Sequence, residues 1–182
     1  MVSHNSMGVK AISSPKKIGI VADTHDRLEL IDEVVKELNG EGVDLVLHAG
    51  DYVSPFSILR FKPLKAKLIG VFGNNDGDKN LLRKRSEEIG AEIQGKFAEL
   101  DVGGLKIALL HGEEEKLLKA LINSNYYDVV VYGHTHKVEN INVGKTLVIN
   151  PGEACGYLSG SATIAVLNLE EMKVKIISLK HG

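Results

Sequence analysis

Short polar motifs follow a series of short apolar runs along the chain, and this alternation constrains the fold more than any other feature. The motifs are Asp23-Thr24-His25, Gly50-Asp51, Gly73-Asn74-Asn75-Asp76, His111-Gly112 and Gly133-His134-Thr135-His136. They contain carboxylate, amide and imidazole groups, which bind hard and borderline metal ions. A fold that gathers strand ends at one edge of a sheet would bring all of these groups together. The pattern therefore predicts a site for two metal ions.

The first half of the chain alternates between strand-like and helical patterns. Strands are expected over residues 17–22, 44–48 and 67–72, and helices over 28–38, 55–61 and 78–89. The strand segments are almost continuously apolar, which is typical of a parallel sheet that is buried on both faces.

The second half of the chain is dominated by hairpin patterns. Hairpins are expected for residues 97–102 with 105–110, 138–143 with 146–149, and 161–169 with 173–178, together with a helix at 114–122 and a strand at 128–132. The order predicts an α/β fold with two packed sheets and outer helices. We expect residues 1–15 to be a flexible N-terminal lead and residues 16–182 to be a single domain.

Composition excludes several classes of protein. The net charge is -2 over 182 residues, with no general basic character, so we expect no binding to long nucleic acids. No apolar run approaches the roughly 20 residues of a membrane span. The single cysteine, Cys155, cannot form an internal disulfide, and the first residues lack an apolar signal core, so we expect a cytoplasmic protein. The sequence leaves a homo-oligomer open.

The motifs supply seven oxygen or nitrogen ligands, enough for two metal ions. They are Asp23, His25, Asp51, Asn74, His111, His134 and His136. Asp51 is the natural bridge, because a carboxylate offers two oxygens. Alternate residues of an extended segment point the same way, so Asp23 and His25 could bind one ion, and His134 and His136 could bind one ion or two neighbouring ions. His48, inside an apolar run, is interpreted as a packed residue or as a residue that supports a metal ligand.

Charge and ligand type indicate the chemistry of such a centre. Two divalent ions, two aspartates and a bridging hydroxide leave a positive cluster, which suits an anionic phosphate ester. The set contains no thiolate, which leaves manganese, iron, nickel, cobalt or catalytic zinc open.

The motif order D-x-H, G-D, G-N-x-D, H-G and G-H-T-H resembles the calcineurin-like metallophosphoesterases. The small size and the late Asn150-Pro151-Gly152 are similar to the branch of YfcE and the small archaeal phosphodiesterases. The resemblance implies a four-layer α/β/β/α sandwich of two mixed β-sheets flanked by helices. It implies one ion held by Asp23, His25, Asp51 and His136, and a second held by Asp51, Asn74, His111 and His134. It also implies a metal-dependent phosphodiesterase or phosphatase, often activated by manganese, with a metal-bridging hydroxide as nucleophile and a small phosphate ester as substrate.

The chain departs from this family at Asn75, where the family usually has a histidine that contacts the phosphate or protonates the leaving group. Asn75 can donate a hydrogen bond but cannot act as a general acid near neutral pH. Asp76, the usual partner of that histidine, loses its expected role, and His134 or Asn75 is expected to contact the phosphate. Asn75, Asp76 and His134 are thus the candidate catalytic residues.

Two other functions are compatible with this pattern. The retromer subunit of the vacuolar sorting machinery resembles the same small fold and acts as a protein-binding scaffold, although such a module need not keep every ligand. A metal-dependent nuclease is the other alternative, which the absence of a basic stripe disfavours. The complete set of seven ligands favours an enzyme.

Overall fold

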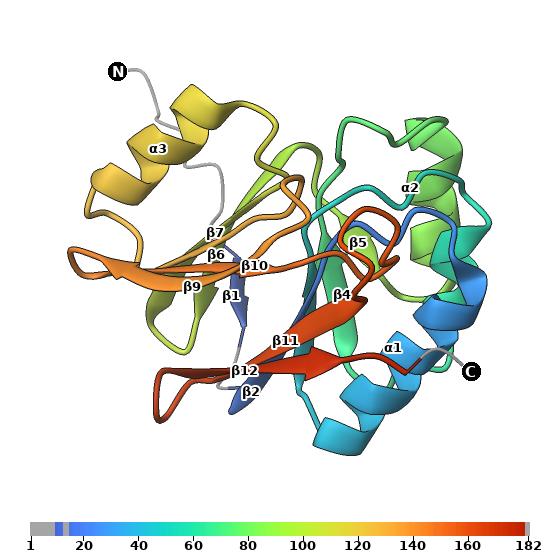
Figure 1. The fold of residues 1–182 in the computed structure, drawn as a ribbon, viewed down its shortest axis with the longest axis horizontal. Coiled ribbons are helices and arrows are strands. Elements are labelled where there is room, and N and C mark those ends of the chain that lie inside the picture. The colour runs from blue at the N-terminus through green and yellow to red at the C-terminus, as the bar shows by residue number, and fades with distance from the viewer. Residues whose placement is uncertain (1–9, 13–14, 181–182) are drawn as a thin grey trace, which may run out of the picture.

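Two six-stranded mixed sheets form the centre of the molecule in the computed structural model, which describes residues 10–12 and 15–180 (Figure 1). The first sheet contains, in spatial order, β12 (Lys173–Ser178), β11 (Thr163–Asn168), β2 (Lys17–Val21), β3 (Leu45–His48), β4 (Lys67–Gly70) and β5 (Glu92–Ile93). The second contains β1 (Lys10–Ile12), β6 (Phe97–Val102), β7 (Leu105–Leu110), β8 (Val129–Val131), β10 (Thr146–Pro151) and β9 (Val138–Val143).

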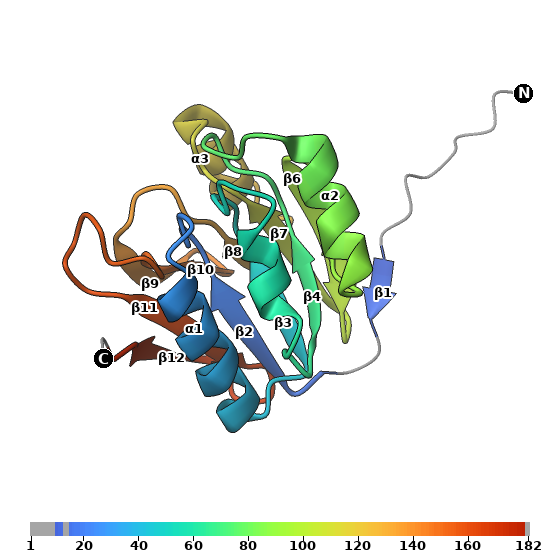
Figure 2. The ribbon, with the colours of Figure 1, turned by 90° about the vertical axis from the view of Figure 1, so that its right-hand side faces the viewer.

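Helices cover the outer face of each sheet. Helices α1 (Leu28–Glu41) and α2 (Lys79–Glu88), with the 3-10 helix η1 (Ser57–Phe61), pack on the first sheet, and Figure 2 shows α1 and α2 in front of β2, β3 and β4. Helix α3 (Glu115–Asn123) packs on the second sheet. The result is the expected four-layer α/β/β/α sandwich.

Among the described residues, no helix is long and apolar enough to cross a membrane.

One hydrophobic core lies between the two sheets, and another lies between the first sheet and its helices. Alternate residues of β2 and β3, such as Ile18 and Leu45, face β7 and β8 residues such as Ile107 and Val129, and all four are almost completely buried. The intervening residues, such as Val46, face the helices instead. Both faces of the first sheet are therefore apolar, which explains the continuous apolar runs in the sequence.

The strand register brings the candidate site residues to one edge. Strands β2, β3 and β4 are parallel, and their last residues Val21, His48 and Gly70 are aligned. In the second sheet β7, β8 and β10 are also parallel, with Leu109 aligned to Val131. The polar motifs follow these strands directly, so they emerge side by side.

Two strands were not expected from the sequence. Strand β5 is a two-residue parallel edge strand beside β4. Strand β1, which pairs in parallel with β6, lies within residues 1–15, where a flexible lead is expected from the sequence. The rest of that lead, apart from residue 15, lies outside the described residues.

Candidate metal centre

The loops that carry the candidate ligands have an unusual backbone. Five of the seven residues have positive φ: Asp23 (54°), His25 (41°), Asp51 (61°), His134 (64°) and His136 (59°). Neither Asp23 and His25 nor His134 and His136 therefore lie in an extended segment, contrary to expectation, because each pair lies in a tight loop after its strand. Left-handed non-glycine residues cost free energy and gather at functional sites, where the surrounding structure holds them in place.

Backbone hydrogen bonds hold these loops against one another. The amide of Asp23 donates to the Gly50 carbonyl (3.1 Å), and the amide of His25 donates to the Asp51 carbonyl (3.1 Å). A Cβ atom added at Gly73 would lie 2.1 Å from Asp51 Oδ1, so only glycine lets the next loop approach this carboxylate.

The first group of candidate ligands surrounds Asp23 Oδ1. His136 Nε2 lies 3.6 Å and His25 Nε2 lies 3.8 Å from this oxygen, and His25 Nε2 lies 3.4 Å from Asp51 Oδ2. Asp23 Oδ1 and His25 Nε2 are buried and have no hydrogen-bond partner among the described residues. Buried polar atoms without a partner are costly in a folded protein. A cation among them would remove that cost.

The second group surrounds His111. Its Nδ1 lies 2.7 Å from the Ala49 carbonyl, so Nδ1 carries the proton and donates it in a hydrogen bond. In the neutral imidazole Nε2 then has only a lone pair, yet it lies 2.9 Å from Asn74 Oδ1 and 3.3 Å from Asp51 Oδ2. Three lone-pair atoms converge there, which a bound cation satisfies.

The pKa shifts at the site show that both groups attract positive charge. Burial opposes ionisation of Asp51, but His111 and the hydrogen bonds from Asn75 hold the pKa of its carboxyl well below the usual range. Burial would lower the pKa of His111, but the Asp51 carboxylate raises it above its usual value. The neighbouring Asp23 carboxylate likewise raises the pKa of His25 against the effect of burial.

The three candidate catalytic residues lie in different surroundings. His134 contributes its backbone amide to Asp23 Oδ2 (3.0 Å), and its half-buried ring lies 5.1 Å from the His111 ring, between centroids. Asn75 donates hydrogen bonds to both carboxylate oxygens of Asp51, from its backbone nitrogen to Oδ1 (2.9 Å) and from its side-chain Nδ2 to Oδ2 (2.7 Å).

Asp76, the third candidate catalytic residue, accepts its hydrogen bonds from backbone amides. It is buried and accepts hydrogen bonds from the backbone amides of Asp51 (3.2 Å), Gly73 (2.7 Å) and Val53 (2.8 Å). It ties the loop after β3 to the loop after β4, so its contacts are those of a positioning residue.

Glu153 is the residue of the site that sequence reasoning missed. Its carboxylate lies 2.7 Å from His136 Nδ1, which orients Nε2 of that ring toward Asp23. Although burial opposes ionisation, hydrogen bonds from Ser159, His136 and Cys155 lower the pKa of Glu153 to about 2. The only signal in the sequence was a lone carboxylate among small residues after Asn150-Pro151-Gly152, and it did not reveal the partner.

Two other residues near the site remain neutral. The thiol of Cys155 lies close to His25 and His136, with the candidate ligand atoms of all three within 4.8 Å of one another. Burial raises the pKa of the Cys155 thiol to about 12, so it is not a ready thiolate ligand. His48 is buried, stacks on Tyr52 and accepts a hydrogen bond from the Gly50 amide (3.1 Å), in agreement with its interpretation as a packed residue.

Comparison with known proteins identifies the family. The sequence model of the calcineurin-like phosphoesterase superfamily domain matches residues 17–172. The phosphodiesterase MJ0936 of Methanocaldococcus jannaschii is 42% identical over 165 residues, which are 90% of this chain and 99% of that protein. The chain therefore belongs to the calcineurin-like phosphoesterase superfamily and is a hydrolase of phosphate esters, and its family implies divalent metal cofactors.

Solved structures agree with this assignment. The structure of a novel archaeal phosphodiesterase superposes with a TM-score of 0.86 at 42% identity and covers 90% of this chain and 99% of its own. YfcE, a phosphoesterase from E. coli, superposes with a TM-score of 0.64 at 18% identity, covering 90% of this chain and 100% of its own, and shows the fold alone. The resemblance found in the motifs is confirmed.

Proposed function

We propose that this phosphoesterase hydrolyses phosphodiesters with two divalent metal ions held by the seven candidate ligands. One ion would be held by Asp23, His25, Asp51 and His136, and the other by Asp51, Asn74, His111 and His134. The observation that supports this division most strongly is the position of Asp51 Oδ2, which lies 3.4 Å from His25 Nε2 and 3.3 Å from His111 Nε2. One carboxylate oxygen thus belongs to both groups of lone pairs.

The ions, when bound, would place positive charge near the ester oxygens and would lower the pKa of a water so that hydroxide is available to attack phosphorus near neutral pH. The residues of the chain perform the remaining tasks. Glu153 holds the His136 ring and Asp76 holds the backbone of Asp51, so that both ligands are preorganised. The half-buried ring of His134 and the Nδ2 of Asn75 are the groups proposed to contact the phosphate.

Position 75 sets the preferred kind of ester. Asn75 has no proton to give to a departing alkoxide near neutral pH. We therefore propose that diesters with good leaving groups, such as aryl oxides, react faster than ordinary phosphomonoesters. Its two hydrogen bonds to Asp51 also indicate a role in holding the bridging carboxylate.

Several finer properties belong to the same proposal. Manganese is the proposed metal, with iron, nickel, cobalt and zinc as alternatives, because the ligands are oxygen and imidazole nitrogen. The proposed substrate is a small phosphate ester, the proposed location is the cytoplasm, and residues 16–182 are proposed to act as a single domain.

The test uses protein stripped of metal by exhaustive chelation and assayed against mono- and diesters with each metal added back. We expect no turnover without metal, the best recovery with manganese, and faster hydrolysis of aryl diesters than of monoesters. In Asp51→Asn, both ions would lose their shared anionic ligand. Metal content by elemental analysis should therefore fall for both sites, and kcat should drop by about 10² or more. Full activity after chelation, or two tightly bound ions in Asp51→Asn, would contradict the two-metal mechanism.

The alternatives raised by the sequence receive less support. A protein-binding scaffold has no need for the lone pairs that converge on Asp51, His25 and His111. A nuclease for long nucleic acids is disfavoured by the near-neutral overall charge of the chain.

A further inference from the structure

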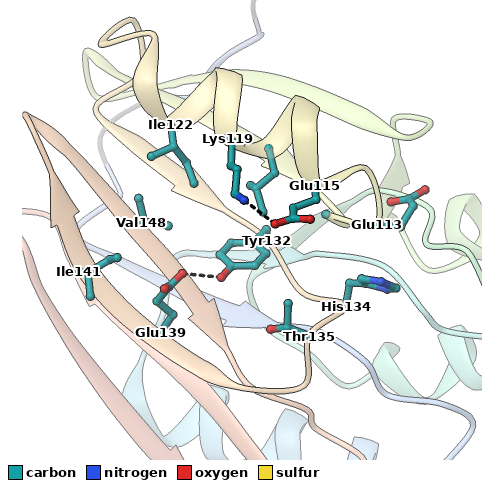
Figure 3. A pocket seen from close by; sticks show the side chains of 12 residues that line it. Glu113, Glu115, Lys119, Ile122, Tyr132, His134, Thr135, Glu139, Ile141 and Val148 are labelled. Carbon is teal, nitrogen blue, oxygen red and sulfur yellow. Dashed lines mark hydrogen bonds and ion pairs between the residues drawn. The ribbon is translucent and has the colours of Figure 1, made fainter.

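A cavity beside the metal centre has properties that the hydrolytic chemistry does not explain. It has a volume of about 490 Å³, within the range of small-molecule sites, and lies between α3 and strands β9 and β10. His134 and Thr135 line the cavity at one end, so it is continuous with the loop that follows β8. Figure 3 shows these two residues on one side and Ile122, Ile141 and Val148 on the other, with the Tyr132 ring between them.

The far part of the cavity is apolar. Leu118 and Val148 are buried, and Ile122 packs beside them in the cluster under α3. Ile141 is 45% exposed although it is a large aliphatic residue. When an apolar group covers an exposed aliphatic side chain on a concave surface, the burial of both apolar surfaces favours binding.

The charged residues that line the cavity limit what can enter. They include three carboxylates, Glu113, Glu115 and Glu139, and a single ammonium group, Lys119. Lys119 is paired with Glu115, and Glu139 accepts a hydrogen bond from the Tyr132 hydroxyl. Glu113 is paired with Lys96, so Glu139 is the one lining carboxylate here that has no cation beside it among the described residues. A second phosphate or a carboxylate in this cavity would still meet net negative charge, whereas an uncharged group would not.

We propose that the cavity binds an uncharged aromatic substituent of the phosphate ester while the phosphate lies at the metal centre. The proposal rests on the proposed function and names its substrate class: esters with one flat apolar group and no second anionic group. Continuity through His134, the apolar far wall and the acidic lining each support this occupant.

The test compares inhibitors that carry one substituent each, so that its position is unambiguous. Methylphosphonate and phenylphosphonate are titrated as competitive inhibitors of the metal-loaded enzyme acting on methyl 4-nitrophenyl phosphate. We expect phenylphosphonate to bind at least tenfold more tightly, and 4-carboxyphenylphosphonate to lose most of that advantage. Equal inhibition constants for the methyl and phenyl compounds would overturn the proposal.

Variants locate the effect in the cavity. Ile141→Trp should fill the far end and Ile141→Ser should remove its apolar wall, so both should reduce the phenyl advantage while the inhibition constant of methylphosphonate stays the same. The matched control is Leu117→Trp, since Leu117 is also 45% exposed but lies on α3 outside the cavity. The phenyl advantage must survive in Leu117→Trp. An advantage that survives equally in both Ile141 variants would overturn the proposal.

A binding measurement separates this inference from the proposed function. Isothermal titration of the metal-loaded protein with the two phosphonates reports the phenyl advantage even if no diester is hydrolysed. Absence of hydrolysis with a retained, Ile141-dependent advantage would contradict the phosphodiesterase function alone. Hydrolysis without any advantage would contradict the aromatic site alone.

Discussion

Asn75 stands where a general acid would be expected, and its replacement gives a direct test of leaving-group chemistry. General-acid help is typically worth about 10² to 10⁴ in rate, and most for poor leaving groups. Asn75→His should therefore raise kcat/KM for alkyl esters more than for aryl esters. Matched alkyl and aryl phosphates measured with both proteins decide this. Because Asp76 is already bound to three backbone amides, the gain depends on whether it can also orient the new imidazole. Equal gains, or none, would show that position 75 does not govern leaving-group protonation.

His48 makes stability depend on pH. Burial lowers the pKa of His48 to about 3, whereas an exposed histidine has a pKa of about 6.5. Between pH values of about 6.5 and about 3, His48 binds a proton in the unfolded chain but not in the folded protein. This contribution to the free energy of unfolding is therefore fully present above about pH 6.5, and it is lost by up to about 1.4 kcal/mol per pH unit as the pH falls toward 3.

His48→Gln should abolish this dependence. Urea unfolding of both proteins between pH 4 and pH 8, with chelator present, gives the difference in their free energies of unfolding. We expect that difference to be constant above pH 7 and to move in favour of the variant as the pH falls. A difference that does not change with pH would show that His48 titrates normally in the folded protein.

At the scale of elements, the end of α1 offers a matched pair of glycines. A Cβ added at Gly40 or Gly42 meets no atom within 4 Å, so neither substitution creates a clash. Gly40 lies within the helix, whereas Gly42 forms its left-handed C-cap with φ 64°. Alanine costs about 1 kcal/mol less than glycine in a helix but about 1 to 2 kcal/mol more in the left-handed conformation.

Gly40→Ala should therefore stabilise the protein by up to about 1 kcal/mol, and Gly42→Ala should destabilise it by a similar or larger amount. Chemical denaturation of the two variants measures both changes. Since both positions lie at the end of α1, away from the loops that carry the candidate ligands, kcat should not change in either. Changes of the same sign in both variants would contradict the C-cap argument.

At the scale of the whole molecule, the candidate ligands come from both sheets. Asp23, Asp51 and Asn74 follow strands of the first sheet, whereas His111, His134 and His136 follow strands of the second. Ions held between these residues, as proposed, would join the two halves of the sandwich and would not bind in the same way to the unfolded chain. Metal binding should therefore stabilise the entire fold by linkage.

Each ion at a free concentration of 100 times its Kd adds about 2.7 kcal/mol to the free energy of unfolding. Thermal unfolding of metal-free protein with increasing manganese should show a Tm that rises with metal concentration, and a much smaller rise in Asp51→Asn. A Tm that does not respond to manganese in the wild-type protein would argue against ions that bridge the sheets.

The sequence by itself determined the features that depend on neighbouring residues. Apolar runs predicted the parallel strands β2, β3 and β4, and glycine turns predicted the hairpins of β6 with β7 and β9 with β10. The polar motifs at the ends of these runs predicted which side chains would meet. These inferences succeed because the carboxyl ends of parallel strands share one edge of a sheet, whatever the details of packing.

Only the tertiary structure decided how those side chains are held. Asp23 and His25, both with positive φ, donate backbone hydrogen bonds to carbonyl groups of the loop after β3, and the amide of His134 reaches Asp23 across 111 residues of sequence. The pairing of Glu153 with His136, the backbone contacts of Asp76 and the apolar cavity beside His134 likewise join segments that are distant in the chain. Local sequence carries no signal for such contacts, because their free energy arises only when the two sheets and their loops have packed together.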